Sequence, residues 1–271
     1  GSLLSLILTR VFFALAVSAA NEGGSPVTCT TDSGFWVTLV LLVLTALAAA
    51  FYVPSPLAEE SASPARFAVN ARRLTESAIL IALGTVLSEI KIIMVPFGGG
   101  ITICAMVPMI LLAYRWGLKW GFFSSFVFGV FQMILGIAKH SFGFELWIVI
   151  VDILLEYILA YTLLALGGLF RNRFKSPVAA LTLGGALAVF ARYFVHFVAG
   201  FLFWGSYAEW FFTDGAGVSI GDMILGNFQG AGLAVVYSGI LNGSLMLGEM
   251  VITVVALAII GKVPQLAKKV A

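Results

Sequence analysis

Long apolar segments recur along the whole chain and place the strongest limit on its fold. They run near residues 3–20, 35–53, 77–95, 101–114, 120–138, 146–170, 178–204 and 233–261. A helix needs about 20 mainly apolar residues to cross a bilayer, and its backbone polar groups are then paired within the helix itself. The segments therefore predict eight helices and an all-α polytopic membrane protein. A soluble domain is excluded, because 61% of the 271 residues are hydrophobic and only 10% are charged.

Lysine and arginine gather in alternate loops between these segments. The basic residues are Arg72, Arg73, Arg115, Lys119, Arg171, Arg173, Lys175, Lys262, Lys268 and Lys269. Loops rich in Lys and Arg stay on the cytoplasmic side of a membrane. We therefore predict a multi-pass protein of the cell membrane, with both termini of its core in the cytoplasm. The net charge of +2 is scattered over loops and forms no basic face for nucleic acid.

A stretch rich in Pro, Ser and Ala, PSPLAEESASPARFA (54–68), separates the first two segments from the rest. It predicts a linker. Residues 1–68 would then form an N-terminal extension with two transmembrane helices, and residues 69–271 a six-helix domain. The first segment ends in AVSAA, as signal peptides do, but Arg10 interrupts its apolar core, so we expect an uncleaved helix. Cys29 and Cys104 lie in different contexts, and we expect neither a disulfide nor a metal site.

Five ionisable residues lie inside the apolar segments, where a charge costs about 2.5–3.5 kcal/mol at the bilayer centre. Asp152 and Glu156 are four residues apart in one segment, Arg192 and His196 are four apart in another, and Glu249 lies in the last. One interpretation is that they form ion pairs that join helices. The other is that they line a polar cavity in the outer half of the bundle.

Aromatic and amide side chains near the same helix ends favour the cavity. They are Tyr157, Tyr193, Trp204, Tyr207, Tyr237 and Asn242. Trp204 alone is more typical of the aromatic belt at a membrane interface than of a binding site. In combination with Glu156, Arg192 and His196, however, the set suits a small polar ligand with a flat ring. Aromatic faces would stack on the ring, amides and carboxylates would bind its edge, and a carboxylate would balance a positive charge.

Four stretches in order resemble a known family. They are GGGITICAMVPMILLAYRWGLKWG (98–121), LLEYILAYTLLALGGLF (154–170), ARYFVHFVAGFLFWGSYA (191–208) and YSGILNGSLMLGE (237–249). Together they resemble the thiamine-specific S components, the ThiT family, of energy-coupling factor (ECF) transporters, over roughly residues 70–262. The resemblance implies a six-helix S-component fold with a thiamine pocket near the extracellular face. It also implies assembly with an ECF coupling transmembrane subunit and two ATPase subunits.

The resemblance also implies the residues of the pocket. They are Glu156, Tyr157, Arg192, Tyr193, His196, Trp204, Tyr237 and Asn242. Trp204 would stack on the aminopyrimidine, and Glu156 would be the main polar anchor for a ligand whose thiazolium ring is always cationic. Arg192 opposes such a cation unless Glu156, Asp152 or a phosphate of the ligand engages it. Thiamine, its phosphates and a pyrimidine precursor therefore all stay open as ligands.

Two features differ from part of the family, and a third concerns assembly. Gly99 and Ile103 stand where some members have Trp and an acidic residue. The loop 207–237 is longer than is usual in the family, and it is either a lid over the site or an insertion without a role in binding. Ala78 and Ala82 form a small-xxx-small face in the first core helix, which permits close helix packing. This face either packs within the bundle or, as the resemblance implies, docks the coupling subunit.

The first hypothesis for function is thus a binding subunit that is not an enzyme and carries no cofactor. No GxxxxGK[ST] loop is present, so the chain cannot hydrolyse ATP by that route. The alternative is a self-sufficient proton-coupled carrier, in which Asp152, Glu156, His196 and Glu249 relay protons, although no inverted repeat is evident. An intramembrane enzyme is least supported, because HExxH is missing and His140 and His196 have no evident third ligand.

Overall fold

The computed structural model describes residues 64–94, 99–136 and 146–270, and these fall into two compact units. The larger unit holds the described residues up to His196 and those from Ser244 onward, and the smaller holds 197–243. The two predicted N-terminal helices lie outside the described residues. Four described helical stretches are long and apolar enough to cross a membrane: Leu118–Gly136, Ile148–Gly168, Pro177–Phe203 and Gly230–Gly261. The fold is therefore that of a helical multi-pass membrane protein.

The first described helix, α3 (Pro64–Glu89), differs from its prediction at both ends. It begins inside the predicted linker, because its first half is polar and hydropathy does not reveal it; the domain boundary after residue 68 stays a prediction. It ends at Glu89, and the segment that was predicted to continue it forms a strand, β1 (Lys91–Met94). β1 pairs antiparallel with β2 (Gly100–Thr102) in a small hairpin. The β-branched Ile92 and Ile93 suit a strand.

The next helices form the core of the larger unit. They are α4 (Val107–Trp116), α5 (Leu118–Gly136), and a continuous run of α6 (Leu146–Ile153), the π-helix η3 (Leu154–Leu159), α7 (Ala160–Thr162) and the 3-10 helix η4 (Leu163–Gly168). Gly117 has φ of 90° and makes the turn between α4 and α5 possible. Buried Met109, Ile110, Leu112 and Phe128 belong to one apolar cluster.

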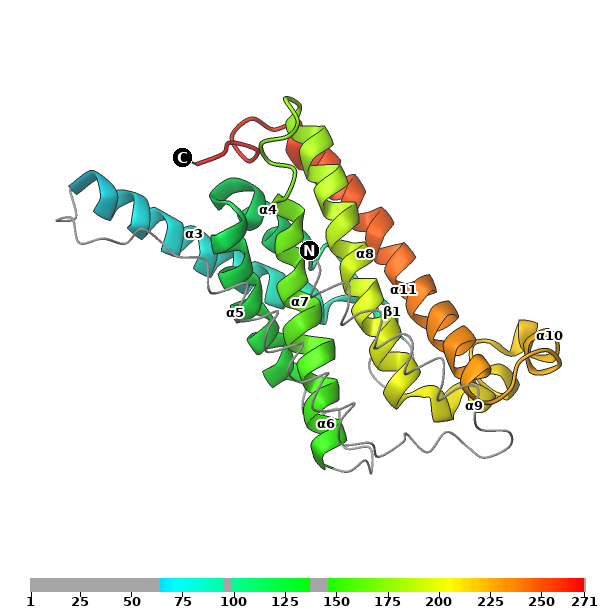
Figure 1. Cartoon of the computed structure of the whole chain (residues 1–271). Coiled ribbons are helices and arrows are strands. Elements are labelled where there is room, and N and C mark those ends of the chain that lie inside the picture. The colour runs from blue at the N-terminus through cyan, green and yellow to red at the C-terminus, as the bar shows by residue number, and fades with distance from the viewer. Residues whose placement is uncertain (1–63, 95–98, 137–145, 271) are drawn as a thin grey trace, which may run out of the picture. The chain divides into compact units, whose positions relative to one another are not determined.

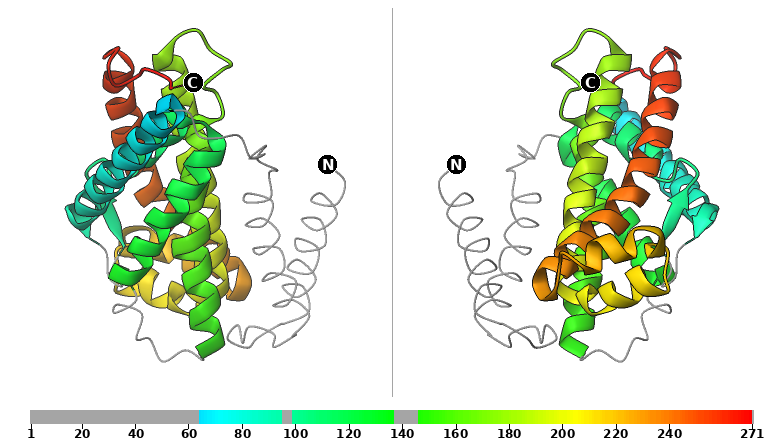
Figure 2. Two further views of the ribbon diagram at one scale, coloured as in Figure 1. Left: turned by 90° about the vertical axis from the view of Figure 1, so that its left-hand side faces the viewer. Right: turned by 90° about the vertical axis from the view of Figure 1, so that its right-hand side faces the viewer.

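Two long helices, α8 (Pro177–Phe203) and α11 (Gly230–Gly261), contribute to both units. In the larger unit they pack closely: a side chain at Gly185 would collide with Leu257, and one at Gly261 with Val178. Within the larger unit the two helices are therefore antiparallel neighbours (Figure 2). Small residues at helix contacts are typical of membrane bundles, in which close backbone approach replaces the hydrophobic drive.

The smaller unit contains the long predicted loop, and much of that loop is helical. After the end of α8 come η5 (Gly205–Tyr207), α9 (Ala208–Thr213), η6 (Val218–Ile220) and α10 (Gly221–Leu225). They lie beside the first turns of α11 (Figure 1). Phe211, Phe212 and Ile224 are buried among them. The short helices thus form a packed element with a core of its own.

Candidate ligand-binding site

The site in the larger unit is built around Arg192 on α8, whose side chain is buried. Its Nε donates a hydrogen bond to Nε2 of His196 (3.2 Å), and its Nη2 donates to the hydroxyl of Tyr161 (3.0 Å). Its Nη1 donates to the sulfur of Met106 (3.2 Å). The guanidinium also lies over the ring of Tyr161, 4.3 Å from the centroid. All of these partners of the cation, within the described part of the chain, are neutral groups.

Glu156 extends the cluster on the other side of the imidazole. Its Oε1 lies 3.7 Å from Nδ1 of His196, and its side chain is 23% exposed. Because Nε2 of His196 accepts a hydrogen bond from Arg192, the neutral imidazole must carry its proton on Nδ1, the atom that faces Glu156. A neutral His196 does not cancel the charge of Glu156. Among the described residues, no Lys or Arg forms an ion pair with Glu156.

Glu156 and Tyr157 lie in a π-helical stretch, which the sequence did not predict. A π-turn widens the helix by one residue and is frequent at functional sites. Tyr157 reaches α5, where any side chain at Gly136 would collide with its ring. Tyr193, also in the larger unit, is half-buried and packs on Phe190 with ring centroids 6.1 Å apart. The structure therefore joins Glu156, His196 and Arg192 directly and places Tyr157 against a neighbouring helix.

The other three predicted residues belong to the smaller unit. Trp204 follows the end of α8, is buried, and packs on Tyr207 with centroids 5.7 Å apart. Tyr237 is buried against Phe211 in an edge-to-face contact of 5.2 Å. Asn242 donates to the hydroxyl of Ser238 (3.1 Å), which in turn donates to the carbonyl of Phe197 (2.7 Å). These contacts join the end of α8 to the start of α11.

Sequence reasoning missed several residues of these clusters. Tyr161 follows Tyr157 by four residues, so the same spacing that linked Arg192 to His196 would have found it. Met106 gave no signal, because a methionine in an apolar run is usually core. Thr102 gave none either, although its backbone N–H and its hydroxyl both donate to Oε1 of Glu249 at 2.7 Å.

Ala78 and Ala82 lie on an open face of α3. Both are exposed, together with Leu74, Ile79, Leu83 and Val86. None of the described helices covers this face, and both interpretations from the sequence, packing within the bundle and docking of the coupling subunit, stay predictions. A groove of about 480 Å³ adjoins it, lined by Arg72, Thr75, Glu76, Ile79, Leu80, Leu111, Arg115, Gln265 and Leu266.

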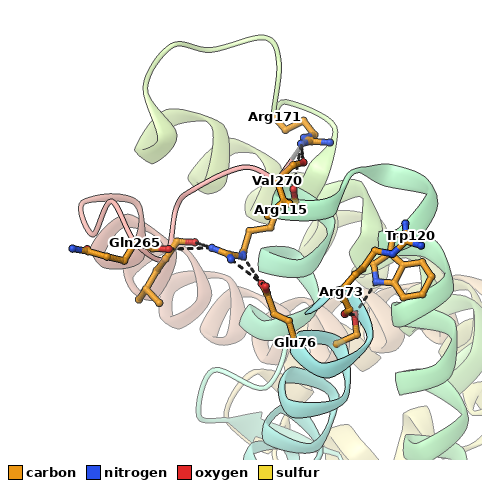
Figure 3. A network of polar contacts seen from close by, with 9 residues as sticks. Arg73, Glu76, Arg115, Trp120, Arg171, Gln265 and Val270 are labelled. Atoms are coloured by element: carbon orange, nitrogen blue, oxygen red, sulfur yellow. Dashed lines mark hydrogen bonds and ion pairs between the residues drawn. The ribbon is translucent and has the colours of Figure 1, made fainter. Parts of the chain in front are cut away.

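The predicted basic loops meet at the same end of the larger unit, as Figure 3 shows. Arg115 forms an ion pair with Glu76 and donates to the carbonyls of Gln265 (3.1 Å) and Leu266 (2.7 Å). Arg171 donates to the carbonyls of Arg115 and Val270, both at 3.2 Å. The C-terminal segment is thereby fastened to α3 and α4.

A helical multi-pass fold with charged and aromatic groups inside its helices is typical of membrane transport proteins. The family model described as thiamine transporter protein (Thia_YuaJ) matches residues 74–220. ThiT of Bacillus subtilis is 30% identical over 149 residues, which cover 50% of this chain and 72% of that protein. ThiT of Lacticaseibacillus paracasei is 32% identical over 172 residues, or 59% and 73% of the two chains.

The solved structure of ThiT from Listeria monocytogenes matches with a TM-score of 0.56 and 27% identity, over 73% of this chain and 98% of the other. The chain belongs to the thiamine transporter family. The resemblance seen in the sequence is confirmed, and so is the expectation that the chain is a membrane transporter, not an enzyme.

Proposed function

We propose that this chain binds thiamine tightly and is the S component of an ECF-type uptake transporter. The observation that carries the proposal is the buried cluster in which neutral His196 leaves the charge of Glu156 available, in a chain that belongs to the thiamine transporter family. Thiamine unites a cationic thiazolium with an aminopyrimidine. Glu156 would balance the first, and aromatic and amide groups such as Trp204 and Asn242 would bind the second.

Binding by the purified full-length chain tests the ligand. Calorimetric titration with thiamine, its mono- and diphosphate, hydroxymethylpyrimidine, riboflavin and biotin would rank them in one series. We expect thiamine or a thiamine phosphate to bind most tightly, and riboflavin and biotin not to compete. If hydroxymethylpyrimidine binds as tightly as thiamine, the site recognises only the pyrimidine, and the role of Glu156 as a counter-charge is wrong.

The exposed Ala78–Ala82 face supports the second part of the proposal, in which the chain delivers its ligand inward together with a coupling subunit and two ATPase subunits. Small residues let a partner helix approach the backbone of α3 closely. Ala78→Trp or Ala82→Trp should therefore abolish co-purification with the coupling subunit and ATP-driven uptake, and leave thiamine binding nearly unchanged. Val255→Trp, an exposed position on α11, is the matched control.

A transport assay on the chain alone distinguishes the S component from the alternative, a self-sufficient carrier. Proteoliposomes that contain only this chain should not accumulate thiamine under a pH gradient if the partners supply the energy. Accumulation by the chain alone would replace the S-component proposal with a proton-coupled carrier, in which Asp152, Glu156, His196 and Glu249 are the candidate proton sites. Survival of assembly in both tryptophan variants would show that this face of α3 is not the docking surface.

A further inference from the structure

Glu249 is a buried carboxylate that the proposed ligand contacts do not use. It lies on α11 with 1% of its surface exposed. Its Oε1 accepts two hydrogen bonds from Thr102, one from the backbone N–H and one from the hydroxyl, both 2.7 Å long. At the neighbouring Gly248 a side chain would collide with Ile101. Strand β2 is thus seated on α11 at one point, by packing and by a carboxylate that is costly to bury in a membrane.

The segment that follows Thr102 leads directly to the ligand site. Cys104 has φ of 58°, a left-handed conformation that a residue other than glycine adopts only where its surroundings impose it. Met106 comes two residues later and is fully buried, and its sulfur accepts the hydrogen bond from Nη1 of Arg192. The Thr102–Met106 segment is therefore held by Glu249 at its first residue and contacts the guanidinium of Arg192 through its last.

The second carboxylate oxygen of Glu249 shows which atom of the side chain makes the polar contacts. Oε2 is buried and has no hydrogen-bond partner among the residues that the structure describes. All of the polar contact therefore passes through Oε1, which an amide oxygen can replace. A leucine, in contrast, would remove the acceptor and leave the N–H and hydroxyl of Thr102 without it.

We propose that Glu249 is a positioning residue of the binding site. It holds the Thr102–Met106 segment on α11, and through Met106 it fixes the guanidinium of Arg192, which in turn orients His196 toward Glu156. This inference rests on the proposed function, because its effect is read as affinity for thiamine. Glu249 itself does not touch the ligand.

A double-mutant cycle tests this route, because residues that act through one another have non-additive effects. In the full-length chain, Glu249→Leu should weaken thiamine binding about tenfold, and Glu249→Gln should weaken it less than about threefold. Arg192→Met should weaken binding as well. In the Arg192→Met background, adding Glu249→Leu should cost less than about a further twofold. Calorimetric titration of the four proteins gives the cycle.

Additive losses, an equal loss for Glu249→Gln and Glu249→Leu, or unchanged affinity in Arg192→Met would each overturn the inference. If Glu249→Leu does not fold, Thr102→Val removes only the hydroxyl donor and enters the same cycle, with an expected loss of about threefold. Thr253→Val is the control, because Thr253 is as buried as Glu249, lies one turn along α11, and has no hydrogen-bond partner for its hydroxyl among the described residues. The affinity of this variant for thiamine should be that of the wild type. A wild-type chain that does not bind thiamine would refute the proposed function instead.

Discussion

Two buried arginines of the larger unit, Arg115 and Arg192, are held in opposite ways. Arg115 meets the carboxylate of Glu76 and the main-chain carbonyls of Gln265 and Leu266 (Figure 3). Arg192 meets an imidazole, a thioether and a phenol. Across the ranges that the structure describes, no ion pair joins Arg192 to a carboxylate. Within the described ranges, Arg115 therefore has a carboxylate partner and Arg192 has none.

The difference indicates that Arg115 stabilises the fold, and it fits the proposed role of Arg192 in ligand binding. A buried charge is costly unless it is paired and hydrogen-bonded. Arg115 satisfies that condition and fastens the C-terminal segment to α3. Among the described residues, Arg192 is hydrogen-bonded only to neutral acceptors. Local rules of this kind are broken mainly at functional sites, where other parts of the fold compensate.

The largest effect is expected from Arg115→Leu, which would leave the mostly buried carboxylate of Glu76 unpaired. Breaking a buried pair on one side costs about 3 kcal/mol or more, so the melting temperature in detergent should fall clearly. Thiamine affinity at low temperature should stay within about twofold of the wild type, because Arg115 lies outside the site. Arg72→Leu, an exposed neighbour, should change neither. A large loss of affinity in Arg115→Leu would remove the contrast between the two arginines.

Glu156→Gln should have the next largest effect, and it should act on binding. The change keeps the shape of the side chain and removes its charge. The affinity for thiamine should therefore fall by about tenfold or more, as expected for the loss of a charge-assisted hydrogen bond. Hydroxymethylpyrimidine has no thiazolium and should lose much less. Parallel titrations of both ligands give the comparison. Equal losses would mean that Glu156 is only a hydrogen-bond acceptor.

Arg192→Gln sharpens the comparison through the phosphates of thiamine. A phosphate would supply the anion that Arg192 lacks among its described neighbours. The variant should therefore lose about tenfold more affinity for thiamine monophosphate than for thiamine. Competition between the two ligands in wild type and variant measures this ratio. An unchanged ratio would confine Arg192 to orienting His196.

Trp204→Ala should have the smallest of these effects. Stacking on an aromatic face contributes about 1 kcal/mol, or roughly fivefold in affinity. The fold should be retained, as helix content by circular dichroism would show. Phe211→Ala, which removes a buried ring of the same unit, is a control for packing loss. If thiamine binds Trp204→Ala as tightly as the wild type, the ring belongs to the packing with Tyr207 and not to the site.

The helices of the core were predictable where hydropathy marks them. The segments predicted near 120–138, 178–204 and 233–261 correspond to α5, α8 and α11 within about three residues. The polar start of α3 and the change from helix to strand at Lys91 were not, because both depend on what the segment packs against. A short apolar run of β-branched residues fits a strand as well as a helix.

The candidate site was also predictable only in part. The four-residue spacing of Arg192 and His196 places both on one helix face, and the structure joins them by a hydrogen bond. The bond from Arg192 to Met106 joins residues 86 positions apart, and that from Thr102 to Glu249 joins residues 147 apart. Neither has a local signal. The π-helical stretch that contains Glu156 likewise had no signal in the sequence.

The sequence by itself determined that this chain is a membrane protein, which family it resembles and which polar residues lie inside its helices. Composition and periodicity carry that information, because a lipid environment tolerates few arrangements of backbone and charge. Only the tertiary structure decided which of those residues meet. It gave Arg115 a carboxylate and left Arg192 with neutral partners, because the partner of a buried charge is chosen by contacts between distant segments.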